Sequence, residues 1–150
     1  MAKRALLVAA LALAACGGEE PEASLERLIE AAEAAAEARD TGYFRDLIAA
    51  SYMDSRGNDR DRLIDALRGY FLTNPRIDVV TRIEATQLLG RDAARVVLLA
   101  GILGRGGGAG VLGGFDGRVY EIELELVATG GDWQIIGARW ERSVNARLGE

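Results

Sequence analysis

The side chains that could perform acid–base chemistry in this chain are its carboxylates and its four tyrosines. The sequence has no histidine, so it lacks the usual general base near neutral pH and the commonest nitrogen ligand for metals. Its only cysteine is Cys16, and its only lysine is Lys3. A catalytic thiol, an internal disulfide and a zinc–thiolate site are therefore excluded for any domain that follows Cys16. We expect no metal and no cofactor.

Two carboxylates are candidates for a base. Glu141 lies two residues from Arg139 near the end of a strand-like segment, and the arginine would hold this carboxylate ionised. We therefore favour an ion pair at a pocket rim over a catalytic pair. Asp54 could be a buried acid at a pocket mouth, but residues 54–58 read Asp-Ser-Arg-Gly-Asn, which is typical of a turn that Asp54 caps. Because Arg56 stands where a calcium loop needs an oxygen ligand, no calcium site is expected.

The glycine-rich segment 104–117 has some likeness to a phosphate-binding loop. It lacks the Gly-Lys-Ser/Thr ending, and no helix follows it to direct a dipole at an anion. We interpret it as a long connection between two strands, which is compatible with a flap over a pocket.

The first fifteen residues have the organisation of a signal peptide. Lys3 and Arg4 precede an apolar run over 5–15 that is too short to span a bilayer. The run ends in Leu-Ala-Ala-Cys over 13–16, which resembles the lipobox of bacterial lipoproteins. The resemblance implies cleavage before Cys16 and acylation of this cysteine with palmitate-type chains. The alternative is an ordinary signal peptide followed by a coincidental cysteine.

Residues 16–23 are then the lipidated cysteine and a flexible tether. Gly17 replaces the aspartate that, in many Gram-negative bacteria, keeps a lipoprotein at the inner membrane. The resemblance therefore favours the periplasmic face of the outer membrane in the cell envelope, with the lipid on Cys16 as the membrane contact.

The composition is that of a globular domain with an acidic surface. Hydrophobic residues make up 49% and charged residues 27%, and the formal net charge is −5. Removal of Lys3 and Arg4 with the signal peptide leaves 16 basic against 23 acidic residues, a net charge of −7. Such a surface repels nucleic acid, so we expect no nucleic-acid partner.

Apolar spacing predicts three helices followed by strands. The first helix covers 24–40 with Ser24 as N-cap, and the second carries Tyr43, Leu47 and Tyr52 on one face. Asn58 or Asp59 caps a third helix, which Asn-Pro at 74–75 ends. From residue 76 the apolar period is two, and strands are expected over 77–89, 93–103, 118–128 and 132–142. The fold class is α+β, with three N-terminal helices packed on a four-stranded antiparallel sheet.

Three short segments resemble nuclear transport factor 2-like domains. They are Tyr52-Met53-Asp54 before Gly-Asn-Asp-Arg at 57–60, Gly-Tyr-Phe at 69–71, and Gly-Asp-Trp-Gln-Ile at 131–135. The resemblance covers 24–144 and leaves 145–150 as a tail. It implies a curved, cystatin-like sheet that encloses a conical pocket. The superfamily includes ketosteroid isomerases, dehydratases, polyketide cyclases and proteins that only bind, so the fold alone chooses no function.

Strand pairing predicts which side chains face that pocket. A two-residue turn at Gly130-Gly131 pairs Leu126 with Ile135, and the same rule applies at Gly90-Arg91. The polar side chains assigned to the concave face or to helices beside it are Tyr52, Tyr70, Thr81, Gln87, Tyr120, Arg139 and Glu141. A one-residue bulge would invert part of this assignment.

The sequence is compatible with three functions. An apolar pocket without a placed acid or base favours a binding module for a small apolar ligand or a protein partner, with no catalysis. The second is an isomerase, dehydratase or cyclase that uses a pocket carboxylate and a tyrosine. The third is a structural or assembly role through a homodimer, formed by an apolar patch on the outer sheet face. The residues predicted for that patch are Val97, Leu99, Ile136 and Trp140.

Overall fold

The computed structural model describes residues 20–105 and 118–143. Within them the chain forms α1 Pro21–Glu37, α2 Thr41–Leu47, β1 Ile48–Asp54, α3 Arg60–Thr73, β2 Arg76–Leu88, β3 Ala93–Arg105, β4 Arg118–Thr129 and β5 Asp132–Arg142. The predicted signal peptide, Cys16, residues 106–117 of the glycine-rich segment and the tail lie outside the described residues.

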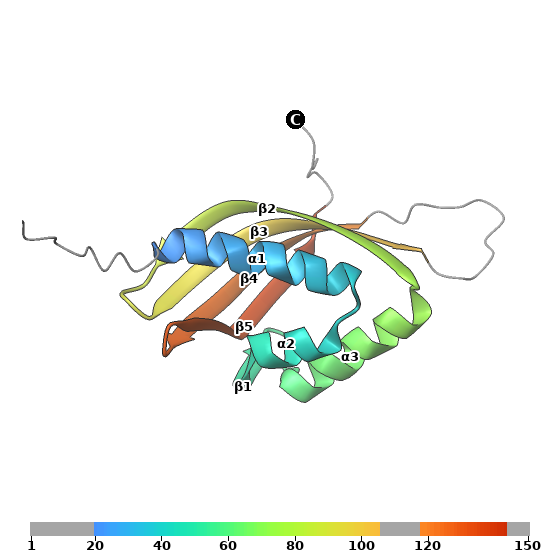
Figure 1. Cartoon of the computed structure of the whole chain (residues 1–150), viewed down its shortest axis with the longest axis horizontal. Coiled ribbons are helices and arrows are strands. Elements are labelled where there is room, and N and C mark those ends of the chain that lie inside the picture. The colour runs from blue at the N-terminus through green and yellow to red at the C-terminus, as the bar shows by residue number, and fades with distance from the viewer. Residues whose placement is uncertain (1–19, 106–117, 144–150) are drawn as a thin grey trace, which may run out of the picture.

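The five strands form one curved sheet in the order β1-β5-β4-β3-β2. The long strands pair antiparallel, and the short β1 pairs parallel with β5. In Figure 1, α1 crosses one face of this sheet, and α2 and α3 lie beside β1 at its lower border. The predicted α+β layout is confirmed. None of the described helices is long and apolar enough to cross a membrane.

The prediction of four strands, and of a second helix that continues to Tyr52, was wrong from Ile48 onward. Helix α2 ends at Leu47, and the chain continues as β1, in which Tyr52 is buried and Met53 is exposed. Ile48 lies opposite Ile135 of β5, so pairing with the sheet competes with continuation of the helix. The spacing of Leu47, Ile48 and Tyr52 fits either structure, and the tertiary contact decides between them.

Helix α1 begins three residues before the predicted cap at Ser24. Pro21 occupies the first turn, where its missing N–H costs nothing, and no side chain caps this end. The tether predicted over 16–23 is therefore shorter, because its last residues are helical. At the other end Arg39 adopts a φ of 57°, and the N–H of Asp40 donates to the Ala35 carbonyl at 2.8 Å. This left-handed residue helps to end the helix at Glu37, three residues before the predicted end at Asp40.

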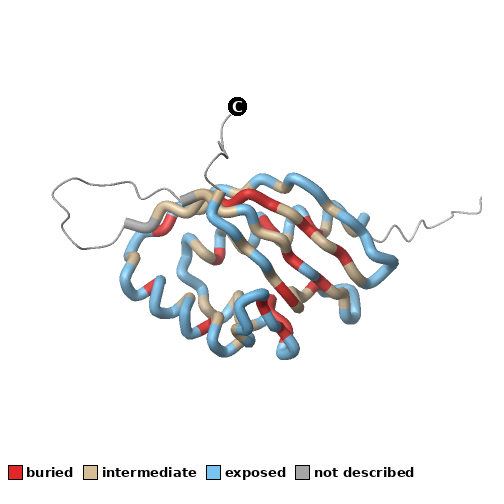
Figure 2. The backbone as a smooth tube through the Cα atoms, turned by 180° about the vertical axis from the view of Figure 1, so that it is seen from behind, coloured by how far each residue is buried: buried red, intermediate tan, exposed pale blue. Residues whose placement is uncertain are grey.

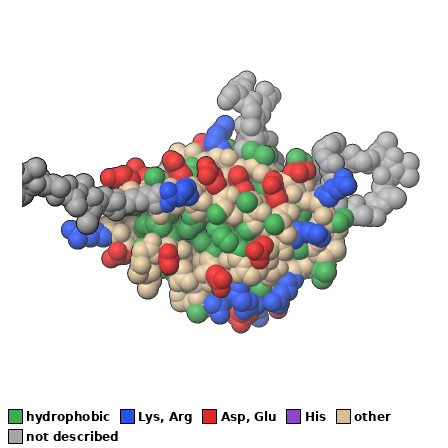
Figure 3. Space-filling model, in the orientation of Figure 1, with side chains coloured by type: hydrophobic (Ala, Val, Ile, Leu, Met, Phe, Trp, Pro, Cys, Tyr) green, Lys and Arg blue, Asp and Glu red, His purple; other side chains and the backbone are tan. Residues whose placement is uncertain are grey.

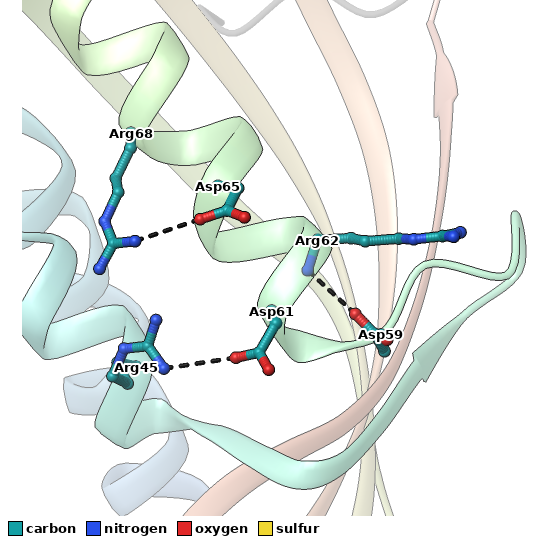
Figure 4. A network of polar contacts seen from close by, with 6 residues as sticks. All are labelled: Arg45, Asp59, Asp61, Arg62, Asp65 and Arg68. Carbon is teal, nitrogen blue, oxygen red and sulfur yellow. Dashed lines mark hydrogen bonds and ion pairs between the residues drawn. The ribbon is translucent and has the colours of Figure 1, made fainter.

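Carboxylates fix the start of the two shorter helices. Asp40 accepts a hydrogen bond from the Tyr43 N–H at 3.1 Å, and Asp59 accepts one from the Arg62 N–H at 2.9 Å. The predicted cap of the third helix is thus Asp59. Figure 4 shows the exposed ion pairs nearby, in which Asp61 at 3.3 Å from Arg45 links α3 to α2. Such exposed pairs contribute at most about 1 kcal/mol each.

The core lies between α1 and the inner face of the sheet. Leu25 and Ile29 of α1 contact a group of buried strand residues, and Ile64 of α3 packs on Ile48 and Tyr52. Figure 2 shows the buried positions concentrated along the middle strands. The strand residues of the first group are Ala94, Val96, Leu98, Ala100, Leu124, Leu126 and Trp133.

Two β-bulges change which face the strand ends present. Leu126 pairs with Ile135 as predicted, but the register shifts after this pair, so that Leu124 lies opposite Ala138. In β2 the register shifts between Ile83 and Ala85. Because side chains alternate along a strand, each extra residue moves all following side chains to the opposite face.

Two glutamates of α1 accept hydrogen bonds from the free edge of β2. The backbone N–H of Thr81 donates to Glu33 at 2.5 Å, and that of Val79 donates to Glu37 at 3.1 Å. Glu33 and Glu37 are four residues apart, so they point the same way from the helix. The pairs satisfy donors that an edge strand otherwise offers to another chain.

Candidate functional site

The structure keeps some predicted pocket residues on the inner face and moves others outward. Thr81 and Tyr120 flank Ala100 in one row across the inner face, as predicted. Gln87 lies opposite Arg95 on the outer face. This correction follows from the bulge in β2, which the sequence pattern does not reveal.

Arg139 and Glu141 also lie on the outer face. Arg139 is paired with Glu123 at 3.1 Å, and Glu141 lies opposite Glu121. The prediction that they face the pocket was wrong, because the bulge in β5 inverts this part of the strand. Arg95 joins the same group of charges, at 3.6 Å from Glu123 and 3.1 Å from a second glutamate, Glu125.

The same bulge turns Trp140 inward. Trp140 lies opposite Ile122 on the inner face, and the Arg56 guanidinium lies 4.8 Å from the centre of its ring. The predicted outer patch therefore loses its largest member, and Leu99 is buried beneath its neighbours. The homodimer predicted from that patch stays a prediction with less apolar surface to support it.

Tyr52 and Asp54 form the buried polar pair of the described part of the chain. They alternate with exposed Met53 on β1, so both side chains point inward. The Tyr52 hydroxyl has no hydrogen-bond partner among the described residues. Burial raises the pKa of the Tyr52 phenol, and the charge of Asp54 raises it further. The phenol therefore stays protonated at physiological pH.

Asp54 is occupied by its own loop. Its Oδ1 accepts from the N–H groups of Arg56 and Asn58, each at 2.9 Å, and its Oδ2 accepts from the Asn58 side-chain amide at 2.9 Å. Burial alone would raise the pKa of Asp54, but the hydrogen bonds from Asn58 and Arg56 outweigh it and hold the pKa below its usual value. The carboxylate is a weak base that caps the loop, which agrees with the favoured interpretation of residues 54–58.

An open cleft of about 580 Å³ lies between α1, α2 and the β4–β5 hairpin. Leu28, Tyr43, Leu47 and Trp133 supply its apolar lining. Figure 3 looks onto this side and shows hydrophobic side chains gathered beneath α1, with acidic side chains around them. The polar part of the lining comes from Ser24, Arg27, Asp46, Thr129, Asp132 and Gln134.

Two hydrogen bonds hold the walls of this cleft together. The Gln134 side-chain amide donates to the Asp46 carbonyl at 3.1 Å and so joins β5 to α2. The Tyr43 hydroxyl donates to the Leu28 carbonyl at 3.5 Å, and burial raises the pKa of this phenol. Neither group is placed as a base. None of the described residues forms a group of three or more carboxylates that could hold a metal ion.

No family model matches the sequence, and no curated protein matches it significantly. Solved structures do match. A protein from Novosphingobium aromaticivorans, provisionally named as a scytalone dehydratase, has a TM-score of 0.69 at 11% identity over 82% of this chain and 84% of its own. A ketosteroid isomerase-like protein from Erwinia carotovora atroseptica has a TM-score of 0.63 at 16% identity over 83% and 98%. A protein with a cystatin-like fold from Caulobacter vibrioides has a TM-score of 0.66 at 16% identity over 85% and 92%.

The chain has the nuclear transport factor 2-like fold. It spans 40% of Bd1075 from Bdellovibrio bacteriovorus, with a TM-score of 0.65 at 13% identity. At these identities the likeness establishes the fold and the cystatin-like shape of the sheet. The names of the similar proteins cover both enzymes and proteins without a stated activity, so the fold alone does not select a reaction.

The sequence analysis of this nuclear transport factor 2-like domain did not predict the cleft. Its lining includes none of the residues predicted for a pocket, and Tyr70, 38% exposed on α3, lies outside it. The sequence signals at the cleft were Tyr43 and Leu47 on one face of the second helix and Trp133, two residues after the Gly130-Gly131 turn. The cleft depends on how α1 and α2 meet the hairpin, and this packing is not encoded in any local pattern.

Replacing Tyr52 with phenylalanine tests whether its hydroxyl contributes to the stability of the fold. The buried hydroxyl gains no hydrogen bond within the described structure, so Tyr52→Phe is expected to leave the free energy of unfolding unchanged or raise it by about 1 kcal/mol. Urea unfolding followed by circular dichroism measures this change. A loss of more than about 1 kcal/mol would mean that the hydroxyl has a partner in the folded protein.

Proposed function

We propose that this protein is a lipid-anchored binding module of the bacterial cell envelope, which holds a small apolar ligand in the cleft between α1, α2 and the β4–β5 hairpin. The cleft carries the proposal. Its volume of about 580 Å³ falls within the range of about 300–1,000 Å³ that is usual for small-molecule sites. A lining that combines four apolar side chains with six polar ones suits a ligand with a hydrocarbon part and a polar end.

The charges around the cleft set the kind of polar group that would fit. Arg27 comes from α1, Asp46 from α2 and Asp132 from the start of β5. A ligand with a hydroxyl, amide or zwitterionic end could meet both signs, whereas a strongly charged anion would face the two carboxylates. The ligand class that fits best is therefore a neutral or zwitterionic amphiphile.

The lipobox supports the location. Acylation of Cys16 would hold the domain at the membrane from which such an amphiphile comes, since several acyl chains anchor far more firmly than one. Gly17, in place of the aspartate that retains a lipoprotein at the inner membrane, favours the periplasmic face of the outer membrane.

A second candidate is an isomerase or dehydratase. Buried Asp54 next to the buried Tyr52 hydroxyl favours it, because a carboxylate base and a phenol donor are what such an enzyme needs. The lowered pKa of Asp54 and its hydrogen bonds to Asn58 speak against it, since the carboxylate is not free to accept a proton. The binding module remains the preferred function.

Filling the cleft tests the proposal. Ser24 lines the cleft from α1, so Ser24→Trp should place an indole in it and abolish ligand binding. The matched control is Leu72→Trp, at a side chain that is 86% exposed on α3. We would titrate a soluble form that begins at residue 20 with the apolar probe N-phenyl-1-naphthylamine, and examine the protein from its own envelope by native mass spectrometry.

The wild type and Leu72→Trp should enhance the probe fluorescence and retain a small molecule, and Ser24→Trp should do neither. Equal binding by Ser24→Trp and the wild type would rule out this cleft as the site. Turnover of a ketosteroid or dehydratase substrate that is lost in Asp54→Asn would favour the second candidate instead.

A further inference from the structure

The end of the domain that lies next to the anchor carries two exposed leucines. Leu88, the last residue of β2, is 38% exposed, and Leu89, the first residue of the following turn, is 49% exposed. Figure 1 places the β2–β3 turn, the β4–β5 turn and the start of α1 at the same end of the molecule, and Figure 2 shows the same grouping from behind. We call this end the anchor pole, and define it by Pro21, the β2–β3 turn 89–92 and the β4–β5 turn 130–131.

The tether brings this pole close to the membrane. Pro21, the first residue of α1, is only five residues after Cys16. At no more than about 3.6 Å per residue, the chain between them spans at most about 18 Å. If Cys16 lies at the lipid surface, a domain tied this closely cannot turn freely, and the elements next to Pro21 must stay near the headgroups.

Two backbone hydrogen bonds hold the β2–β3 turn in place. The N–H of Leu89 donates to the Ala93 carbonyl at 2.8 Å, and the N–H of Ala128 donates to the Asp92 carbonyl at 2.9 Å. The second bond joins the β2–β3 turn to β4. The backbone of this turn is therefore held by hydrogen bonds to β3 and to β4, and the side chain of Leu89 in this turn is exposed.

We propose that Leu88 and Leu89 lie against the lipid bilayer that holds Cys16, and that this contact orients the anchor pole toward the membrane. The inference rests on the proposed lipid anchor. Exposed leucines in water are unfavourable, and their burial in the headgroup region is favoured by the hydrophobic effect. The acidic domain gains nothing from anionic headgroups, so the contact is apolar and suits a zwitterionic surface.

The orientation gives the cleft direct access to lipid. Ser24, Thr129 and Asp132, which line the cleft, belong to the start of α1 and the β4–β5 hairpin at this same end. With the pole against the bilayer, the cleft opens beside the headgroups. An amphiphile could then pass between the bilayer and the cleft without crossing a long path through water.

Site-directed spin labelling of the full, lipidated chain tests this contact. Acylation would occupy Cys16, the only native cysteine, so a cysteine introduced as L89C is the unique labelling site. The matched control is L72C, at a side chain that is 86% exposed at the far end of α3. Both proteins are reconstituted in phosphatidylcholine vesicles, and the accessibility of the label to oxygen is compared with its accessibility to a water-soluble nickel complex.

The label at position 89 should show a severalfold higher ratio of oxygen to nickel accessibility than the label at position 72. A C16A form of each variant should show the same low ratio at both positions, because it would not be held at the vesicle. Flotation of the vesicles reports the anchor separately. If the wild-type chain floats but both labels report water, the pole contact is wrong and the anchor stands. If the wild-type chain does not float, both the anchor and the pole contact are wrong.

Discussion

Replacement of Asp54 with alanine should lower the free energy of unfolding by about 2–4 kcal/mol. The buried carboxylate accepts hydrogen bonds from the N–H groups of Arg56 and Asn58 and from the Asn58 side chain. Alanine would leave these donors without their acceptor at the point where β1 turns into α3. Hydrogen bonds to a charged acceptor are worth about twice those between neutral groups, so the loss exceeds that of an ordinary cap.

Urea unfolding of the wild type and Asp54→Ala, followed by circular dichroism, measures the difference. Asp65→Ala is the matched control, because it removes the same type of side chain from an exposed site. Asp65 pairs with Arg68 at 3.1 Å, and its side chain is 73% exposed. The control should change the free energy of unfolding by less than about 1 kcal/mol. Equal effects of the two substitutions would show that Asp54 does not hold the loop.

The pH dependence of this difference follows from the pKa of Asp54. The pKa is lower in the folded protein than in the unfolded chain, where it is about 3.9. The stabilisation is therefore fully present above pH values near 4 to 5 and is lost as the pH falls through the folded-state pKa. The gap between the wild type and Asp54→Ala should narrow as the pH is lowered from 5 toward 2. A gap that widens on acidification would contradict a lowered pKa.

Tyr52 and Asp54 also show how far the sequence leads toward the site. Turn-forming residues over 54–58 identified Asp54 as a cap, because aspartate and glycine at these positions have local conformational preferences. Whether the same carboxylate is buried depends on β1 joining the sheet beside β5, which is a long-range contact. Sequence patterns therefore gave the local role of Asp54 but not its surroundings.

In the strands, too, the local pattern was predicted correctly, and the errors begin at the bulges. The predicted bounds of β5, residues 132–142, agree with the structure, and both residues of the Gly130-Gly131 turn have positive φ, as a two-residue hairpin requires. Side-chain alternation then assigns faces correctly only up to the first bulge. Beyond it Arg139 and Trp140 exchange faces, because one extra residue costs little in a curved sheet and leaves no mark in a pattern of period two.

The cleft could not be predicted from any single segment of the sequence. Leu28 on α1, Tyr43 near the start of α2 and Trp133 on β5 are distant in the chain and meet only through the packing of three elements. Their apolar character predicts burial, and the structure leaves part of their surface to line an open cleft instead. The seven predicted pocket residues followed the expected cone of the superfamily, whereas the cleft lies beside the hairpin at the end of the domain near Cys16.

Leu126 offers the largest core effect of these predictions. It is 1% exposed, contacts the α1 side of the core, and pairs with Ile135 immediately before the bulge. Leu126→Ala should lower the free energy of unfolding by about 2–5 kcal/mol, through lost burial and the cavity left behind. Urea or thermal unfolding measures the loss.

The informative comparison is Glu141→Ala, beyond the bulge. In a bulge-free register Glu141 would face the core side, paired with Tyr120, and its removal would change stability substantially. In the structure Glu141 is exposed and lies opposite Glu121, so its removal should change the free energy of unfolding by no more than about 0.5 kcal/mol. The change should be a small increase, because the repulsion between the two carboxylates is relieved. A large loss for Glu141→Ala would overturn the observed pairing of β4 with β5, and a small loss for Leu126→Ala would contradict the burial of Leu126 in the core. The first result would also remove the reason for placing the charges of this sheet outside and its binding surface in the cleft.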